Sequence, residues 1–360
     1  MSKAAELAAL IGSQTALSNR NMIINGSMAI SQRGTSFSSL SAGAYTCDRW
    51  QLQVAGAGRG TVTQESSGGP AGFKDNFLRV TVATADSSVA SSDMQVLKQV
   101  IEGHVAAFTD AGTSDAKPLT LSFYVRSSVT GTFSATLYTN FNNPSAASYP
   151  AEYTISSANT WEQKTITYPA FTTSSTLATS GYTTGEFYQV RFALMSGSDK
   201  TGTANQWNSA NDFASTNQTN LFATSSATWD IVGVQLELGE QATPFEHRSF
   251  ADELQRCKRY FQTYNEPPAR GTTSGGSTDR MAFMLPVTMR AAPSVTMSGT
   301  LNWYDGAAVG TITGLSATYT EPHSVEFDST SFASGSSSAT RSMVIYNASA
   351  DGALSMDAEL

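Results

Sequence analysis

Between Asn21 and Leu238 the chain alternates hydrophobic and polar residues with a period of two, as strands that bury one face do. In Leu119–Ser128, for example, Leu119, Leu121 and Phe123 share one side of the strand. Turn-forming stretches rich in Gly, Ser, Asn and Pro separate such segments, without helical patterns between them. The alternation predicts nine strands: Met22–Ile30, Thr46–Ala55, Phe77–Ala85, Leu97–Gly103, Leu119–Ser128, Gly131–Asn140, Thr160–Tyr168, Glu186–Ser196 and Thr228–Leu238. We therefore expect a jelly-roll β-sandwich over residues 21–247.

Two short segments show helical spacing instead. Residues 1–20 predict an N-terminal helical attachment segment, and residues 248–266 predict a neck helix that begins with acidic residues and ends with basic ones. Isolated helices of this length barely form in water, so each needs a partner surface. That surface is either the segment's own domain or another copy of the chain. We expect an oligomer interface formed by two stripes: Leu7, Leu10, Ile11 and Leu17, and Phe250, Leu254, Cys257 and Phe261.

The last segment, 267–360, returns to short strands and predicts a small C-terminal β-sandwich, the tip domain. Its expected strands are Arg280–Met289, Ser294–Met297, Leu301–Tyr304, Thr311–Tyr319, Ser324–Phe327 and Arg341–Tyr346. A sandwich of this size buries a limited fraction of its surface and is marginal alone. Self-association would relieve this.

The composition excludes several classes of function. Only 14% of the 360 residues are charged and the net charge is −8, which argues against electrostatic binding of nucleic acid. No apolar run is long enough to span a bilayer, so membrane insertion is not expected. The first twenty residues do not have the pattern of a secretory signal. Ser and Thr together make up about a quarter of the chain, which suits many short strands and turns.

The few cysteines and histidines share no ligand spacing. Cys47 and Cys257 lie far apart, and the three histidines are isolated from them and from each other. A disulfide framework and a single-chain zinc site are therefore improbable, and we expect no cofactor. The sequence leaves open whether any other metal ion binds.

No acidic pair in the sequence predicts catalysis. Asp252 and Glu253 fall in the first turn of the expected neck helix, where acids favour the helix dipole. Glu237 lies between two core leucines and is expected on the outward face of its strand. Because nucleophile and metalloprotease motifs are also missing, we expect no enzyme. A carboxylate pair brought together by folding would make a polysaccharide depolymerase the alternative.

Three stretches of the chain resemble tailed-bacteriophage fibre and virion proteins. They are SNRNMIINGSMAISQRGTS with the following YTCDRWQL, WDIVGVQLELGEQATPFEHRSFADELQRCKRYFQ, and MAFMLPVTMRAAPSVTMSG. The segments IINGSM, LKQVIEG and WDIVGVQLELG are also similar to strands of bacterial carbohydrate-binding jelly rolls. The first resemblance implies a homotrimer in a virion tail fibre outside the capsid, bound to other virion tail proteins and to a host cell-surface glycan. The second implies that calcium could bind near Asp230.

Loop aromatics are the candidate glycan contacts, since such rings stack on pyranose faces while amides and carboxylates bond the hydroxyls. The best group is Trp207 with Asn205, Asn208 and Asp212; the alternative is a Trp207 folded onto the sandwich edge. Trp303 and Tyr304 precede a turn that could lie at the distal tip. Weaker loop candidates are Tyr138, Asn140, Asn142, Asn143 and Tyr182, whereas Trp50, Trp161 and Trp229 are expected in the core.

The sequence thus favours a non-enzymatic phage tail fibre that attaches by its N-terminal part and binds a host receptor, a glycan. A purely structural virion decoration or head fibre is one alternative. A polysaccharide depolymerase is the other.

Overall fold

The computed structural model describes residues 19–139, 147–173, 183–267, 269–272, 279–334, 341–346 and 352–360. The chain forms two compact units: the described residues up to Phe250 together with Leu360, and Ala251–Glu359. We call the first the body and the second the tip unit. Strands dominate both, which confirms the mainly β fold class. No described helix has the length and apolar character needed to cross a bilayer.

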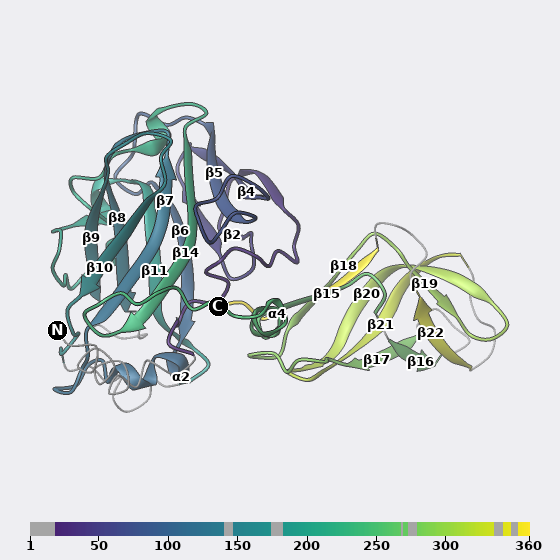
Figure 1. Ribbon diagram of the computed structural model, residues 1–360. Coiled ribbons are helices and arrows are strands. Elements are labelled where there is room, and N and C mark those ends of the chain that lie inside the picture. The colour runs from purple at the N-terminus through teal and green to yellow at the C-terminus, as the bar shows by residue number, and fades with distance from the viewer. Residues whose placement is uncertain are drawn as a thin grey trace. The chain divides into compact units, whose positions relative to one another are not determined.

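Two six-stranded antiparallel sheets face each other in the body (Figure 1). Sheet A contains, in spatial order, β1 (Ser36–Leu40), β4 (Arg59–Glu65), β5 (Phe77–Thr84), β14 (Thr228–Leu238), β7 (Leu119–Ser127) and β10 (Glu162–Tyr168). Sheet B contains β2 (Ala44–Tyr45), β3 (Gln51–Ala55), β6 (Met94–Glu102), β11 (Glu186–Ser196), β8 (Gly131–Thr139) and β9 (Ala147–Ile155). The connections hold α2 (Gly103–Ala106), η2 (Ala107–Thr109), η3 (Ser198–Lys200), β12 (Thr201–Gly202), β13 (Ala214–Ser215) and η4 (Leu221–Ala223).

Aromatic rings join the two sheets at the centre of the body. The ring of Phe192 on β11 lies 5.0 Å from that of Phe123 on β7 and 5.7 Å from that of Trp229 on β14, between centroids. Trp50 lies 6.2 Å from Phe192 and is fully buried. The inward positions of the alternating strands thus form one core, as predicted for Trp50 and Trp229. Trp161 is only partly buried and packs at the edge of this core.

Some predicted strands are absent and some observed strands were not predicted. Residues 22–30 form turns instead of a strand, because Asn25 and Met28 adopt positive φ angles of 59° and 56°. The unpredicted β1 and β4 are rich in polar residues, and the unpredicted β9 contains Pro150. Pro150 is tolerated because β9 is the edge strand of sheet B.

The tip unit combines a small sheet with a closed barrel (Figure 1). The three-stranded sheet has the order β15 (Phe261–Tyr264), β23 (Ala353–Asp357) and β18 (Ser294–Ser298). The barrel has the order β16 (Arg270–Thr272), β17 (Arg280–Met284), β21 (Ser324–Ser334), β20 (Val309–Glu321), β19 (Leu301–Tyr304) and β22 (Ser342–Tyr346). One core that includes Trp303, Ile312 and Phe327 lies beneath both, so this expected β unit is closed into a barrel.

The predicted neck helix is shorter than 248–266. Helix α4 covers Phe250–Lys258, and the chain then enters strand β15, which pairs with β23. Its stripe is also divided: Cys257 and Phe261 are buried in the chain, whereas Phe250 is 64% exposed. The sequence predicted a longer helix because Phe261 lies four residues after Cys257, at helical spacing. Phe261 is buried, but as the first residue of strand β15.

Candidate functional site

The outer face of sheet B carries a line of polar side chains across four strands. Antiparallel register places Gln51 of β3 opposite Lys98 of β6, Lys98 opposite Arg191 of β11, and Arg191 opposite Thr136 of β8. Their chain neighbours Leu52, Leu97, Val190, Phe192 and Leu137 belong to the core. The period of two therefore turns these four residues outward. We call Gln51, Lys98, Arg191 and Thr136 the polar row.

The connection between β11 and β14 covers one half of this face. The backbone N–H of Asn205 donates to the Pro150 carbonyl of β9 (2.9 Å), and Thr136 Oγ1 on β8 donates to the carbonyl of Phe213 (2.7 Å). Gln51 and Lys98, on β3 and β6, stay partly exposed. The polar row thus runs from beneath a covering segment out to solvent.

Arg191 is held rigidly at the edge of the covered half. Its guanidinium carbon lies 3.7 Å from the ring centroid of Tyr138 and 4.2 Å from that of Phe213, so the cation sits against both rings. Nη1 donates to Asn211 Oδ1 at 2.7 Å and to the Asp212 carbonyl at 3.2 Å. Burial lowers the pKa of Arg191 to about 10, which still leaves it charged at neutral pH.

A chain of hydrogen bonds links Arg191 to a carboxylate on its own strand. Arg191 Nε donates to Gln189 Oε1 at 2.7 Å, and Gln189 Nε2 donates to Glu186 Oε1 at 2.6 Å. Tyr138 faces the same group, and burial raises the pKa of its hydroxyl. The guanidinium and its neighbours therefore form a closed, satisfied network.

Lys98 does not take part in that network. Across the described part of the chain, its ammonium has no hydrogen bond and no carboxylate at ion-pair distance. Burial, with a further contribution from the Arg191 charge, lowers the pKa of Lys98 to about 8. A half-buried ammonium opposite another cation is unfavourable for folding. Such a perturbed group with no structural partner is typical of a binding site.

Two glutamine amides accompany Lys98 on β3. Gln51 lies beside Lys98, and Gln53 lies opposite Val96, one position further along the same face. The Gln53 Oε1 atom is buried and has no hydrogen-bond partner among the described residues. Amides of this kind can donate to and accept from sugar hydroxyls. The β3–β6 half of the face therefore offers one cation and two amides to a ligand.

The predicted glycan group around Trp207 is brought together by the fold, on the covering connection. The indole of Trp207 packs edge-on against Tyr149 at 5.4 Å between centroids and lies 4.9 Å from Phe171, while Nε1 donates to the Pro169 carbonyl. This is the alternative arrangement, in which Trp207 folds onto the sandwich edge.

The polar members of that group hold the connection against β9. Asn205 Oδ1 accepts from the Glu152 N–H (3.2 Å), and Asn208 Nδ2 donates to the Thr203 carbonyl (2.9 Å). Asp212 is 6% exposed and accepts from Ser148 Oγ. These contacts are structural, and direct glycan contact by the group stays a prediction.

The other predicted site residues are less accessible or lie elsewhere. Trp303 is fully buried in the tip-unit core and offers no ring face to a sugar, so that prediction is wrong; Tyr304 is 43% exposed. Tyr138 is 5% exposed because its ring lies against Arg191. Outside the described residues lie Asn140, Asn142, Asn143, Tyr182 and the N-terminal stripe of Leu7, Leu10, Ile11 and Leu17.

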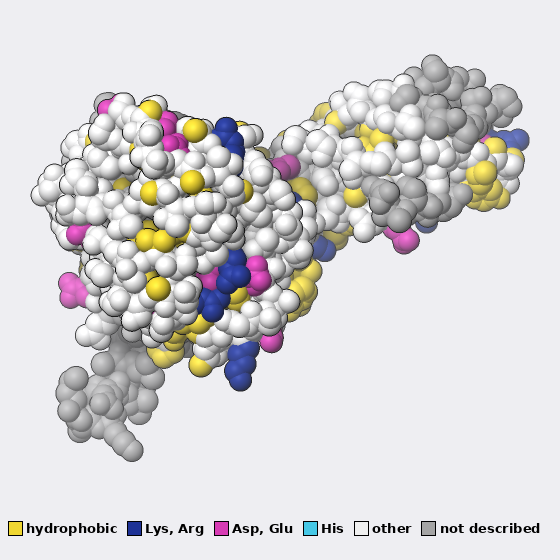
Figure 2. Space-filling view, turned by 90° about the horizontal axis from the view of Figure 1, so that it is seen from above, with side chains coloured by type: hydrophobic (Ala, Val, Ile, Leu, Met, Phe, Trp, Pro, Cys, Tyr) yellow, Lys and Arg dark blue, Asp and Glu magenta, His cyan; other side chains and the backbone are white. Residues whose placement is uncertain are grey.

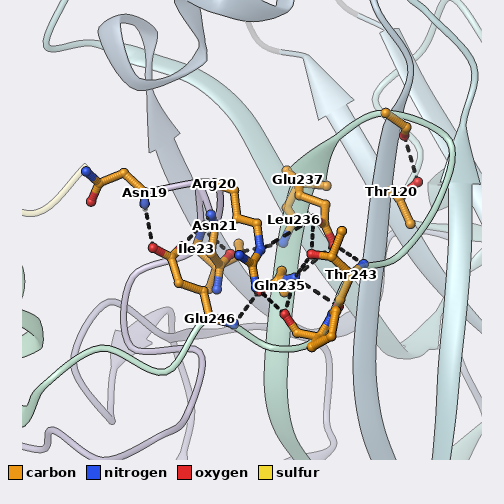
Figure 3. A network of polar contacts seen from close by, with 12 residues as sticks. Asn19, Arg20, Asn21, Ile23, Thr120, Gln235, Leu236, Glu237, Thr243 and Glu246 are labelled. Carbon is orange, nitrogen blue, oxygen red and sulfur yellow. Dashed lines mark hydrogen bonds and ion pairs between the residues drawn. The ribbon is translucent and has the colours of Figure 1, made fainter. Parts of the chain in front are cut away.

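Two sequence motifs that lie more than 200 residues apart meet on the opposite sheet (Figure 3). Asn21 Nδ2 donates to the Val234 carbonyl of β14 (3.1 Å), and Asn21 Oδ1 accepts from the N–H of Leu236 (3.1 Å). Glu246 accepts from the Asn21 N–H (2.8 Å), and Arg248 donates to the Ile23 carbonyl (3.1 Å). We call Asn21, Glu246 and Arg248, with β14, the clasp.

Glu237 lies on the outward face of its strand, as expected, but a later segment covers it. Its side chain is buried, not solvent-facing: it accepts from Thr243 Oγ1 at 2.6 Å and from Gln235 Nε2 at 2.8 Å, and Arg20 lies 3.8 Å away (Figure 3). The segment after β14 folds back and covers this outward face of sheet A. Glu237 therefore serves the closure of the body.

Asp230 is also occupied by protein groups. Arg79 and Arg126 each approach its carboxylate to 2.7 Å, and the side chain is 1% exposed. The two guanidinium groups contact both oxygens of the Asp230 carboxylate, the atoms that a calcium ion would use as ligands. In the described ranges, no three His, Cys, Asp or Glu side chains gather as they would around a metal ion.

Sequence reasoning missed Lys98, Arg191 and the β3 glutamines. The available signal was a single cation at an outward position in each of two largely apolar segments, LKQVIE and FYQVRFAL. Which cation faces which depends on strand register, which alternation alone does not give.

Comparisons with known proteins show likeness at the level of structure. No family model matches the chain, and no curated protein matches it. One similar solved structure is the enzymatically active domain of tailspike protein 4 from bacteriophage CBA120, with 14% identity and a TM-score of 0.34. The match covers 61% of this chain but only 21% of that one.

Carbohydrate-binding modules are also similar. The CBM22-1 xylan-binding domain of Xyn10C from Paenibacillus barcinonensis is 12% identical with a TM-score of 0.29, covering 57% of this chain and 94% of that one. The family 11 module of a cellulosomal cellulase from Clostridium thermocellum is 10% identical with a TM-score of 0.28, covering 58% and 100%. At these values the likenesses assign neither a family nor a ligand to this chain.

Proposed function

We propose that this chain is a non-enzymatic, glycan-binding fibre protein of a tailed-phage virion, and that Gln51, Lys98 and Gln53 contact the saccharide. One observation carries the binding proposal: the half-buried Lys98 ammonium and the buried Gln53 Oε1 atom beside it have no partner within the described part of the chain. Folding gains nothing from leaving such groups unpaired, whereas a ligand rich in hydroxyls would satisfy them.

The virion assignment rests on the sequence motifs. The opening and closing motifs that resemble phage fibre proteins form the clasp, which closes the body as one module. Their role in the clasp explains why these residues occur together. Attachment to other virion tail proteins through residues 1–20, and a place outside the capsid, are parts of the same proposal.

The absence of catalysis is also proposed. Glu237 accepts hydrogen bonds from Thr243 and Gln235, and the Asp230 carboxylate forms ion pairs with Arg79 and Arg126. Neither carboxylate is placed to donate a proton to a glycosidic oxygen. Incubation with bacterial envelope polysaccharides should release no reducing ends, and a time-dependent release would favour a depolymerase.

Glycan binding is tested with the full chain on immobilised bacterial envelope polysaccharides. We expect binding that Lys98→Gln weakens. The matched control is Lys74→Gln, which removes the same charge from an exposed loop residue beside Phe73, whose ring packs on Tyr124 of sheet A. If neither variant changes the binding, the polar row is not the glycan-binding site. If the chain binds no polysaccharide at all, the glycan-binding proposal is wrong.

Trimer formation is tested by mass. The chain mass is 38.1 kDa, and light scattering of the full chain should give three times this value. Of the predicted stripe of Phe250, Leu254, Cys257 and Phe261, the exposed Phe250 and the partly exposed Leu254 stay available to such an interface. A monomer at micromolar concentration would contradict the trimer.

A further inference from the structure

We propose that the polar row selects acidic saccharides, with the ammonium of Lys98 binding a carboxylate or phosphate group of the sugar. This inference rests on the proposed glycan-binding function and names its substrate class. Lys98 and Arg191 are direct cross-strand neighbours, and like charges in that arrangement repel each other.

The Arg191 charge cannot move away from Lys98. Its guanidinium lies against the Tyr138 and Phe213 rings and donates to Gln189, Asn211 and the Asp212 carbonyl. It is 2% exposed, so its part is to position charge near the ligand and not to touch it. An anion next to Lys98 would relieve the repulsion between the two cations.

The nearby carboxylates do not supply that anion. Glu186 accepts a 2.6 Å hydrogen bond from Gln189 and is not at ion-pair distance from Lys98. Asp212 accepts from Ser148 Oγ beneath the covering connection. Lys98 therefore faces the ligand side of the row with its charge only partly offset, by Glu186 beyond ion-pair distance.

The neighbouring groups favour a sugar that carries the anion over a small inorganic ion. Gln51 lies beside Lys98, and the unpartnered Gln53 Oε1 lies on the same face of β3. Neutral amides add little to the binding of a bare ion, but they can bond the hydroxyls of the ring that carries the acidic group. An acidic sugar would use all three side chains.

The proposal predicts a pH dependence. The charged groups that act on Lys98 are Arg191 and Glu186 on β11. Tyr138 on β8 and Asp212 on the covering connection act in turn on Arg191. The pKa of Arg191 is about 10 and that of Tyr138 is raised, so neither changes charge below pH 9. Lys98 with its pKa of about 8 does, and affinity should fall as the pH rises from 7 to 9.

The test compares matched saccharides on the full chain by calorimetry at pH 7. One pair is oligogalacturonate and its methyl ester, in which the carboxylate charge is replaced by a neutral ester with one added methyl group; the other is mannose 6-phosphate and mannose. A charge-assisted contact is worth roughly tenfold or more in affinity, so we expect the acidic member of at least one pair to bind that much more tightly. The pair whose acidic member binds more tightly shows whether Lys98 prefers a carboxylate or a phosphate group.

Variants separate the acidic-sugar inference from the glycan-binding function. Lys98→Gln should remove the acid preference and the pH dependence, Lys98→Arg should retain the preference, and Lys74→Gln should change neither. Equal binding of the charged and neutral members would overturn the acidic-sugar inference and leave glycan binding standing. If the unmodified chain binds neither these saccharides nor any of the immobilised polysaccharides, the proposed glycan-binding function is wrong.

Discussion

The charge of Lys98 does not stabilise the fold. The ammonium is half-buried, lies opposite Arg191 and has no partner among the described residues. Replacing it by Gln should therefore raise the free energy of unfolding at pH 7 by about 1 kcal/mol. Chemical denaturation of both proteins measures this, with Lys74→Gln as the control that should leave stability unchanged.

The same residue predicts how stability depends on pH. Its folded-state pKa of about 8 lies below the ordinary value of 10.5, so the unfolded chain binds the proton more tightly. The contribution of Lys98 to the free energy of unfolding should therefore rise between about pH 8 and about pH 10.5. This rise should be missing from Lys98→Gln; an identical pH profile in both proteins would refute the account of Lys98.

Single residues also show what alternation predicts and what it omits. The outward direction of Glu237 follows from its place between Leu236 and Leu238, but its burial depends on the segment around Thr243 that folds over it. Likewise, the indole of Trp207 was recognisable as a loop residue, and only the fold reveals Phe171 and Tyr149 against it. Coverage by distant segments leaves no periodic signal in the sequence.

At the scale of elements, the clasp ties the start of the body to its last strand. Asn21 is 5% exposed and joins Val234 and Leu236 of β14 through both atoms of its amide. Asn21→Ala would leave those buried backbone groups unpaired, and we expect a loss of about 3 kcal/mol in the free energy of unfolding.

The control for this prediction is Asn205→Ala. Asn205 also accepts a backbone hydrogen bond through its side chain, from Glu152, but in an exposed setting where water can replace it. Thermal denaturation should show a much larger loss for Asn21→Ala. Equal effects of the two substitutions would mean that the clasp does not stabilise the body.

Strands rich in apolar residues were predicted well and polar strands were not. Glu186–Ser196, Thr228–Leu238 and Leu301–Tyr304 have the predicted bounds; in the first two every residue between the ends is buried, and in the third buried and more exposed residues alternate. The strand RGTVTQE of β4 has one large apolar residue, Val62, and its place follows from pairing with β5. Tertiary pairing decides such strands, and local sequence does not record it.

At the scale of the whole molecule, the chain has separate cores. The body core includes Trp50, Phe123 and Trp229, and the tip-unit core includes Trp303 and Phe327, with no residue in common. Scanning calorimetry of the full chain should therefore show two transitions. Ile312→Ala, which empties a fully buried site in the tip unit, should lower only one of them; a single transition that shifts as a whole would contradict independent units.

Few charges mark the surface of this molecule. On the face seen in Figure 2, Lys, Arg, Asp and Glu side chains are sparse apart from one group of both signs on the body, as the 14% content of charged residues leads one to expect. Long-range electrostatic attraction is therefore weak, and recognition depends on short-range contacts at particular places. We therefore expect an unpaired cation such as Lys98 to have a large effect on the proposed glycan binding.

The most direct measurement is a crystal structure of the full chain with an oligosaccharide that binds it, such as oligogalacturonate. The account predicts density for the sugar over β3 and β6 of sheet B, with an acidic group within hydrogen-bond distance of Lys98 Nζ and a hydroxyl at the Gln53 amide. Density at Trp207 or on the tip unit, with Lys98 left unbound, would contradict it.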